Sequence, residues 1–189
     1  MPIRAISLVG LFAACTLIIG AVPAQAKHHH HHKVACTHAA CCSRTHCCES
    51  KKSNDAGAVM FKKGNCKTEL ELMKQAGMCH ILCGKGQITV FCPTDAAYAK
   101  LGKARLDDLK NDPKKLLAAM KYHILGRKVA SGDIQAKGSL ATLEGESLMS
   151  NTKDGHAEVD GCLLSEPDNA ASNGVVHFID DVPLPERGK

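Results

Sequence analysis

The spacing of the apolar residues changes at Gly126, and this change limits the fold more than any other feature of the sequence. Before Gly126 the apolar residues recur at helical intervals, as in residues 112–125, which begin with the N-cap pair Asp112-Pro113. After it the chain breaks into short strand-like runs separated by glycines. Asp154-Gly155 is a typical hairpin turn, because a type I′ turn needs positive φ angles. Helices followed by a mostly antiparallel sheet predict the α+β class.

Other local signals mark the ends of elements. Residues 68–77 show a helical pattern that ends at a glycine, and residues 88–91 read as a strand. Either Thr94 or Asp95 can cap the helix that follows this strand. Asn173-Gly174 stands just before the last strand, where we expect glycine to supply a backbone angle that other residues resist.

The first 26 residues have the order of a secretory signal peptide. One basic residue, Arg4, precedes an uncharged apolar run, and small residues stand at Ala24 and Ala26, where we expect cleavage. The alternative is a membrane anchor, because the run has about the minimum length that spans a bilayer. Cleavage would discard Cys15 and leave a secreted, periplasmic or cell-surface protein with no permanent membrane span.

Cleavage after Ala26 would leave 189 − 26 = 163 residues, enough for one domain with its own core. We interpret residues 27–54 as a flexible His/Cys-rich leader without a periodic apolar pattern. Residues 55–186 form the predicted folded domain, and residues 187–189 a short tail. The sequence does not predict the oligomeric state.

The composition argues against nucleic-acid binding. The formal net charge of +5 is spread among interspersed acidic residues, and the aromatic residues are only two Tyr and four Phe. A nucleic-acid-binding surface needs a basic stripe with stacking rings. We therefore expect a protein or polysaccharide partner outside the cell.

No catalytic residues are predicted. The chain lacks the Gly-x-Ser-x-Gly and His-Glu-x-x-His motifs. Asp180 and Asp181 would point to opposite faces of a strand, so they do not form an acid–base pair. We expect a protein that is not an enzyme and requires no cofactor.

The leader is unusually rich in potential metal ligands. Neutral imidazole and thiolate are good ligands for Zn, Cu and Ni. Three interpretations stay open for this stretch: an expression tag, a metal-ligand array, or a set of half-cystines, since oxidation removes the thiolates. The candidate metal ligands are His28, His29, His30, His31, His32, His38, Cys41, Cys42, His46, Cys47 and Cys48.

Ten cysteines would remain after cleavage, five in the leader and five in the domain. In an oxidising compartment we expect disulfides, each worth about 2–4 kcal/mol. If every thiol is paired within one molecule, at least one bridge joins leader to domain, and we expect it at Cys66. We also expect one of Cys79 and Cys83 to reach Cys92. Exposed Cys-Cys pairs acting as a redox buffer are a further alternative. The disulfide candidates are Cys36, Cys66, Cys79, Cys83, Cys92 and Cys162.

Three separated segments resemble the fasciclin domain family. Residues 88–101, ITVFCPTDAAYAKL, are similar to its first signature segment, and residues 171–185, ASNGVVHFIDDVPLP, to its closing one. Tyr122-His123 falls at the Tyr-His pair of the family. The resemblance covers about residues 55–186 and implies a β-wedge or sandwich with helices packed at one end. Cys66, Glu69 and Cys92 depart from the usual Phe, apolar residue and Ala of the family.

The resemblance also implies a role as an extracellular adhesion or interaction module. The implied partner-binding residues are Tyr122, His123, Glu166, Pro167 and Asp168. Glu166-Pro167-Asp168 is similar to a stretch of the integrin-binding matrix proteins, but Asn169-Ala170 replaces their Ile-Met pair. For Tyr122, His123 and His177 the residues themselves favour a packing role, because a ring among apolar neighbours is usually buried and hydrogen-bonded.

Overall fold

The computed structural model describes residues 54–185. The predicted signal peptide, nearly all of the predicted leader and the predicted tail lie outside the described residues. Within residues 54–185 the chain forms seven helices and one seven-stranded sheet, in the α+β arrangement that the sequence predicts.

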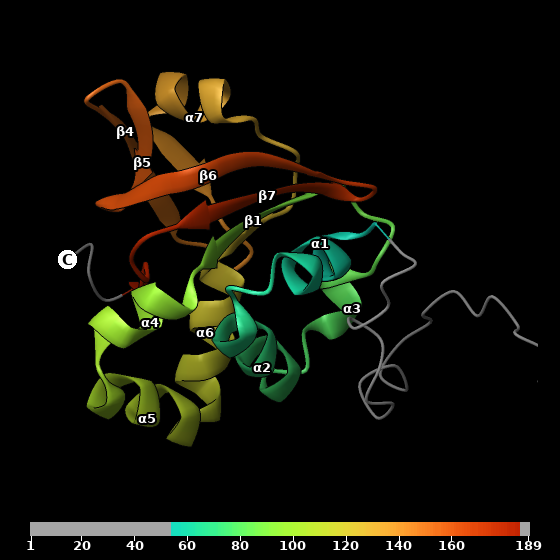
Figure 1. Ribbon diagram of the computed structural model, residues 1–189, viewed down its shortest axis with the longest axis vertical. Coiled ribbons are helices and arrows are strands. Elements are labelled where there is room, and N and C mark those ends of the chain that lie inside the picture. Colours follow the sequence, from blue (N-terminus) through green and yellow to red (C-terminus); the bar gives the residue numbers. More distant parts are fainter. Residues whose placement is uncertain (1–53, 186–189) are drawn as a thin grey trace, which may run out of the picture. The chain divides into compact units, whose positions relative to one another are not determined.

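The strands lie in the order β2-β1-β7-β6-β5-β4-β3 (Figure 1). β1 and β7 pair in parallel, and every other neighbouring pair is antiparallel. The mostly antiparallel sheet is therefore confirmed, but the parallel pairing of β1 with β7 was not predicted. The strands are β1 Ile88–Pro93, β2 Ile124–Leu125, β3 Ser139–Ala141, β4 Ser147–Lys153, β5 His156–Val159, β6 Cys162–Ala171 and β7 Gly174–Ile179.

Six helices gather at one end of the sheet, and the seventh, α7, packs on β4 and β5 at the other end (Figure 1). α1, α5 and α7 were not predicted, because each is short and has a weak or interrupted apolar face. The helices are α1 Ala56–Lys63, α2 Lys67–Gln75, α3 Cys79–Leu82, α4 Asp95–Leu101, α5 Lys103–Asn111, α6 Pro113–Tyr122 and α7 Ser131–Lys137.

Side-chain caps define where the helices begin. Asp112 caps α6 and Pro113 occupies its first turn, as the sequence predicts. The cap of α4 is Thr94, whose hydroxyl accepts the Ala97 N–H at 3.2 Å. Asp95 instead serves a different helix, since its carboxylate accepts the Thr68 N–H at 2.9 Å at the start of α2. This cap ties the first turns of α2 and α4 together.

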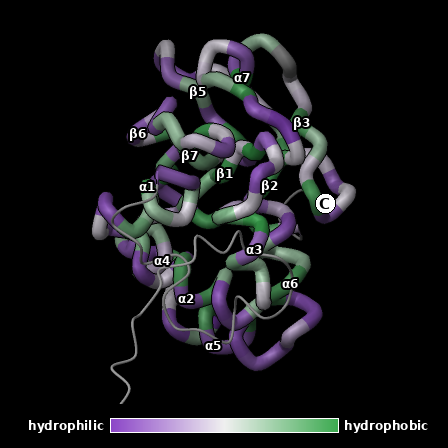
Figure 2. The backbone as a smooth tube through the Cα atoms, turned by 90° about the vertical axis from the view of Figure 1, so that its right-hand side faces the viewer, coloured by the Kyte–Doolittle hydropathy of each residue, from purple (hydrophilic) through white to green (hydrophobic). Residues whose placement is uncertain are grey.

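Strands β1 and β7 separate two apolar clusters. Every residue of β1 and β7 is buried, so neither face of this pair meets solvent. Val90 and Phe178 join the cluster on the side of α1–α6, whereas Phe91 and Ile179 join the cluster on the side of β3–β6 and α7. Figure 2 shows hydrophilic residues along α5, whose one buried residue is Leu109.

The strand turns follow the predicted chemistry. Asp154 and Gly155 have φ angles of 50° and 80°, which confirms the hairpin turn between β4 and β5. Gly174 has a φ of 150°, and a Cβ placed there would lie 1.8 Å from the carbonyl oxygen of Ile88. Glycine is therefore required twice at this position, by its backbone angle and by the close approach of β1.

We predict that Gly174→Ala prevents folding or costs more than about 4 kcal/mol of unfolding free energy, because backbone atoms cannot yield to the new Cβ. Gly132→Ala is the matched control, since Gly132 lies in α7 with open space around it. That control should be neutral or stabilise by up to about 1 kcal/mol. Chemical denaturation of the two variants measures the difference, and equal stability would contradict this account.

Candidate functional site

Tyr122 and His123, implied by the resemblance as partner-binding residues, are both buried. His123 has no exposed surface and Tyr122 is 2% exposed, so neither ring can contact a partner. The Tyr122 hydroxyl donates to Asp160 Oδ2 at 2.5 Å, and burial followed by this hydrogen bond raises the pKa of Tyr122. The partner-binding assignment is wrong for this pair, and the packing interpretation is confirmed.

His123 belongs to a buried polar cluster with Glu69 and Tyr98. The Nδ1 atom of His123 lies 3.1 Å from Glu69 Oε1, and its Nε2 atom lies 2.9 Å from the carbonyl oxygen of Pro183. The Tyr98 hydroxyl donates to the other carboxylate oxygen, Glu69 Oε2. Burial, followed by the neighbouring Glu69, raises the pKa of Tyr98 well above its ordinary value.

The hydrogen bonds of this cluster fix its proton count. A carbonyl only accepts, so His123 Nε2 carries a hydrogen and donates it to Pro183. One further proton lies between His123 Nδ1 and Glu69, giving either an imidazolium–carboxylate pair or two neutral partners. Glu69 was noted in the sequence only as a departure from an apolar position. His123 was singled out in the sequence, but nothing in the sequence indicated that it contacts Glu69.

Glu166, Pro167 and Asp168 lie in an irregular part of β6. The register of β6 against β7 shifts on both sides of Glu166, and Asp168 has a φ of 57°. We call residues 166–168 the β6 bulge. Pro167 and Asp168 are exposed and Glu166 is half-buried, so this segment is accessible, as a partner-binding segment must be.

The Asp168 carboxylate is already engaged within the domain. It accepts the backbone N–H of Ser131 at 2.9 Å and also the Ser131 hydroxyl, at the start of α7. Burial alone would raise the pKa of Asp168, but the bonds from Ser131 outweigh it and hold the pKa below its ordinary value. The role of Ser131 could not be read from the sequence, because the two residues are far apart along the chain.

His177 supports the bulge from beneath. Its Nε2 donates to the carbonyl oxygen of Val129 at 2.9 Å, and its Nδ1 accepts the backbone N–H of Asp168 at 3.0 Å. The ring stacks on Phe91, with the centroids 5.6 Å apart. These partners require the neutral ring, and burial accordingly lowers the pKa of His177. The expected packing role of His177 is confirmed.

The cysteines within residues 54–185 are thiols, so the bridge expected from Cys79 or Cys83 to Cys92 is not formed. Cys66 and Cys92 are both free thiols without exposed surface, and Cys66 is the sulfur that lies next to Cys92. Cys83 does not reach Cys92, because its thiol donates to the carbonyl oxygen of Cys79 at 2.9 Å. Cys66 is enclosed by the core, and the leader cysteines to which we expected it to be joined lie outside the described residues.

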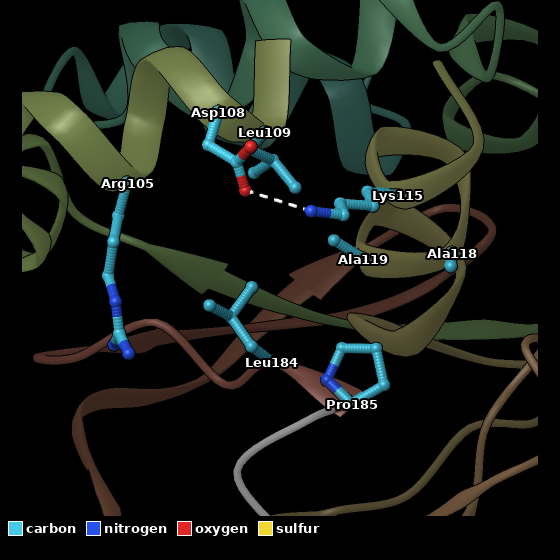
Figure 3. A pocket seen from close by; sticks show the side chains of 8 residues that line it. All are labelled: Arg105, Asp108, Leu109, Lys115, Ala118, Ala119, Leu184 and Pro185. Atoms are coloured by element: carbon cyan, nitrogen blue, oxygen red, sulfur yellow. Dashed lines mark hydrogen bonds and ion pairs between the residues drawn. The ribbon is translucent and has the colours of Figure 1, made fainter. Parts of the chain in front are cut away.

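A surface hollow of about 250 Å³ lies between α5, α6 and the end of the described chain (Figure 3). Asp108 and Lys115 form an ion pair of 3.1 Å across one side of it, and Arg105 extends along the opposite rim. Leu184 and Pro185 form the wall nearest the end of the described chain. The sequence carried no signal for this hollow.

Within residues 54–185 no three His, Cys, Asp or Glu side chains converge in a way that could hold a metal ion. In the same range no helix combines the length and apolar character that crossing a membrane requires. The candidate metal ligands of the leader lie outside the described residues.

Within the described residues, a single parallel strand pair, β1 with β7, in a mostly antiparallel sheet with helices at one end defines a fasciclin-type domain. The family model described as the Fasciclin domain matches residues 64–185, and the chain belongs to this family. Among solved structures, the FAS1 domain pair from the insect cell adhesion molecule fasciclin I has a TM-score of 0.51 at 18% identity, covering 64% of this chain and 45% of that one. This likeness confirms the expected fold.

The similar proteins range from bacteria to mammals. Protein sll1483 of Synechocystis is 35% identical over 62% of this chain and 66% of its own length. Human periostin is 33% identical over 55% of this chain but only 13% of its own length. Immunogenic protein MPB70 of Mycobacterium bovis is 29% identical over 53% of this chain and 51% of its own. This chain thus spans less than two thirds of each of these three relatives.

We predict that Glu69→Ala destabilises the domain by about 3–5 kcal/mol, because it leaves the buried polar groups of His123 and Tyr98 without their partner. Glu69→Gln should cost much less, since an amide can donate to neutral His123 and still accept from Tyr98. Glu71→Ala, an exposed change on the same helix, is the control and should stay within about 0.5 kcal/mol. Urea denaturation tests the order; equal costs for the Ala and Gln variants would exclude this cluster as a stabilising unit.

We predict a pH dependence that comes from His177. Its pKa is lowered in the folded state, so the unfolded chain binds more protons below pH of about 6.5. Unfolding free energy should therefore be complete above that pH and fall on acidification, by up to about 1.4 kcal/mol per pH unit from this residue. Denaturation at several pH values, compared with His177→Gln, isolates the effect. An unchanged pH slope in the variant would refute it.

Proposed function

We propose that this chain is an exported, non-catalytic fasciclin module that mediates adhesion to an extracellular protein or polysaccharide. The observation that carries the proposal is the β6 bulge, an accessible segment held in one conformation by bonds to Ser131, His177 and Lys63. Family membership supports the same function, since the solved neighbour comes from a cell adhesion molecule. The signal-peptide pattern of residues 1–26 supports export.

The β6 bulge is suited to recognition because it is rigid. Asp168 is bonded through its carboxylate to Ser131 and through its N–H to His177. Glu166 forms an ion pair with Lys63 of α1, so the other end of the bulge is also tied to the domain. A segment that is ordered before binding loses less conformational entropy when a partner docks.

The contact residues within the bulge are Glu166 and Pro167. Pro167 is exposed and contributes an apolar surface with little conformational freedom, and Glu166 contributes a partly exposed charge. Asp168 holds Glu166 and Pro167 in position and does not itself contact the partner, because its carboxylate already has two donors from Ser131.

The buried polar groups support a non-catalytic role. Glu69, His123 and Tyr98 would be suited to proton transfer, but all three side chains are enclosed in the core and bonded to one another. A general acid or base must reach its substrate directly or through one water molecule. These groups cannot do so without unfolding of the surrounding helices.

We predict that immobilised full-length protein captures an extracellular protein or glycan and retains it at physiological ionic strength. The double variant Glu166→Ala/Pro167→Ala should lower the affinity by about tenfold, because it removes both contact side chains. Asp107→Ala, a change at an exposed acidic residue of α5, is the control for loss of charge. Binding that disappears in moderate salt, or that survives the double variant unchanged, would contradict the proposal.

A second candidate function is metal binding by the leader, for which the density of His and Cys between His28 and Cys48 is the supporting observation. Titration calorimetry of the full chain with Zn, Cu or Ni tests it. We expect Cys47→Ser/Cys48→Ser to weaken binding if thiolates take part. Binding that depends only on the five-His tract at residues 28–32 would reduce this function to the affinity of a plain histidine run.

A further inference from the structure

Two cysteines from different elements are buried in the same apolar cluster. Cys66 occupies the N-cap position of α2, and Cys92 is the last residue but one of β1. Both side chains are fully buried in the same apolar cluster, and after burial itself the neighbouring Cys66 is the group that raises the pKa of the Cys92 thiol. We propose that Cys66 and Cys92 form a disulfide bond in the oxidised protein. This bond covalently links the start of α2 to β1.

Backbone hydrogen bonds already hold the two segments together. The carbonyl oxygen of Asn65 accepts the N–H of Asp95 at 2.7 Å, and the Asp95 carboxylate accepts the N–H of Thr68 at 2.9 Å. These bonds flank Cys66 on both sides and attach it to a residue three positions after Cys92. A disulfide requires its two backbones to lie close together, and this arrangement supplies that proximity before any bond forms.

Cys79 is buried in the same apolar cluster, but it stands at the start of α3, and Cys66 is the cysteine that acts on the Cys92 thiol. The Cys83 thiol points back to the carbonyl oxygen of Cys79 within its own short helix. Cys162 lies in the apolar cluster on the side of β3–β6 and α7, where its thiol donates to the carbonyl oxygen of Asp160. The sheet therefore separates Cys162 from Cys92, and Cys66 is the partner that the fold places beside Cys92.

Oxidation removes only weak thiol hydrogen bonds at this position. In the thiol form Cys66 donates to the carbonyl oxygen of Met60 at 3.1 Å. That oxygen also accepts the N–H of Gly64 at 3.4 Å, so it keeps a donor when the thiol hydrogen is lost. The Cys92 thiol donates a long bond of 3.8 Å to the carbonyl oxygen of Pro93, so the disulfide replaces two weak S–H donors in all.

The oxidant is a small-molecule or protein disulfide, R–S–S–R. One cysteine thiolate attacks it, releases R–S⁻ and forms a mixed disulfide; the second cysteine then attacks the protein sulfur and releases the second R–S⁻. The two cysteines lose two protons and two electrons in total, and the oxidant becomes two R–SH. Burial raises the pKa of the Cys92 thiol, so exchange must occur before the core closes around it.

Tryptic mapping of the full chain tests the proposal directly. The chain is refolded in a glutathione redox buffer, denatured with N-ethylmaleimide and digested without reduction. Cleavage at Lys and Arg places Cys66 in the peptide 64–67, GNCK, and Cys92 in the peptide 86–100, GQITVFCPTDAAYAK. Cys79 and Cys83 fall together in residues 75–85, so the peptides distinguish the alternatives. We expect the pair 64–67 and 86–100, joined, at two hydrogen masses below their sum.

Recovery of residues 64–67 and 86–100 as separate N-ethylmaleimide adducts, or either one joined to a different peptide, would overturn the proposal. Cys162→Ser is the matched control, because Cys162 is equally buried but lies in the other cluster, and it should keep the crosslink. Reduction followed by refolding should lower the Tm by about 10 °C in the wild type and in this control. The drop should be absent in Cys66→Ser/Cys92→Ser, and the peptide map of the wild type decides the matter if that variant does not fold.

Discussion

The parallel pairing of β1 with β7 is the constraint on which the rest of the domain depends. The two strands run in register from Ile88 opposite Gly174 to Pro93 opposite Ile179, and both are buried on both faces. Because each strand contributes alternate side chains to two apolar clusters, a slip of one residue would exchange the two clusters and place His177 in the wrong one. The missing Cβ of Gly174 permits the backbone contact that sets this register.

Buried polar groups then attach the helices to this pair. Asn173 accepts the N–H of Ala56 at 2.8 Å and donates to the carbonyl oxygens of Leu82 and Gly84, so one side chain joins the start of α1 to the end of α3. On the other side of the pair, His177 joins the chain at Val129 to the β6 bulge. Each polar group is satisfied by a partner distant in sequence, and such networks specify one arrangement of elements because any other leaves a buried group unpaired.

The sequence predicted well whatever depends on neighbouring residues. The Asp112-Pro113 helix start, the Asp154-Gly155 turn and the family segments are local patterns, and the structure confirms them. Contacts between distant segments were not predictable from spacing. Asp95 resembled a cap for its own helix but caps α2. For Cys92 the sequence led us to expect a bond to Cys79 or Cys83, whereas the fold places Cys66 near it. For the site, the sequence located the β6 bulge, but only the fold shows that Ser131 holds Asp168.

The three departures of this chain from the usual fasciclin pattern are all in the buried core. Glu69, Cys66 and Cys92 all lie in the cluster beneath α2, and none has exposed surface, so none can change what the domain binds. They replace apolar packing with directed bonds. The net contribution of such bonds to stability depends on whether every buried polar group has a partner, rather than on the buried area. If the proposed function holds, stability and recognition are set in separate places, the first in the buried core around α2 and the second at the β6 bulge. A substitution at Pro167 can alter the partner without disturbing the core, whereas a substitution at Glu69 acts on folding before it acts on binding.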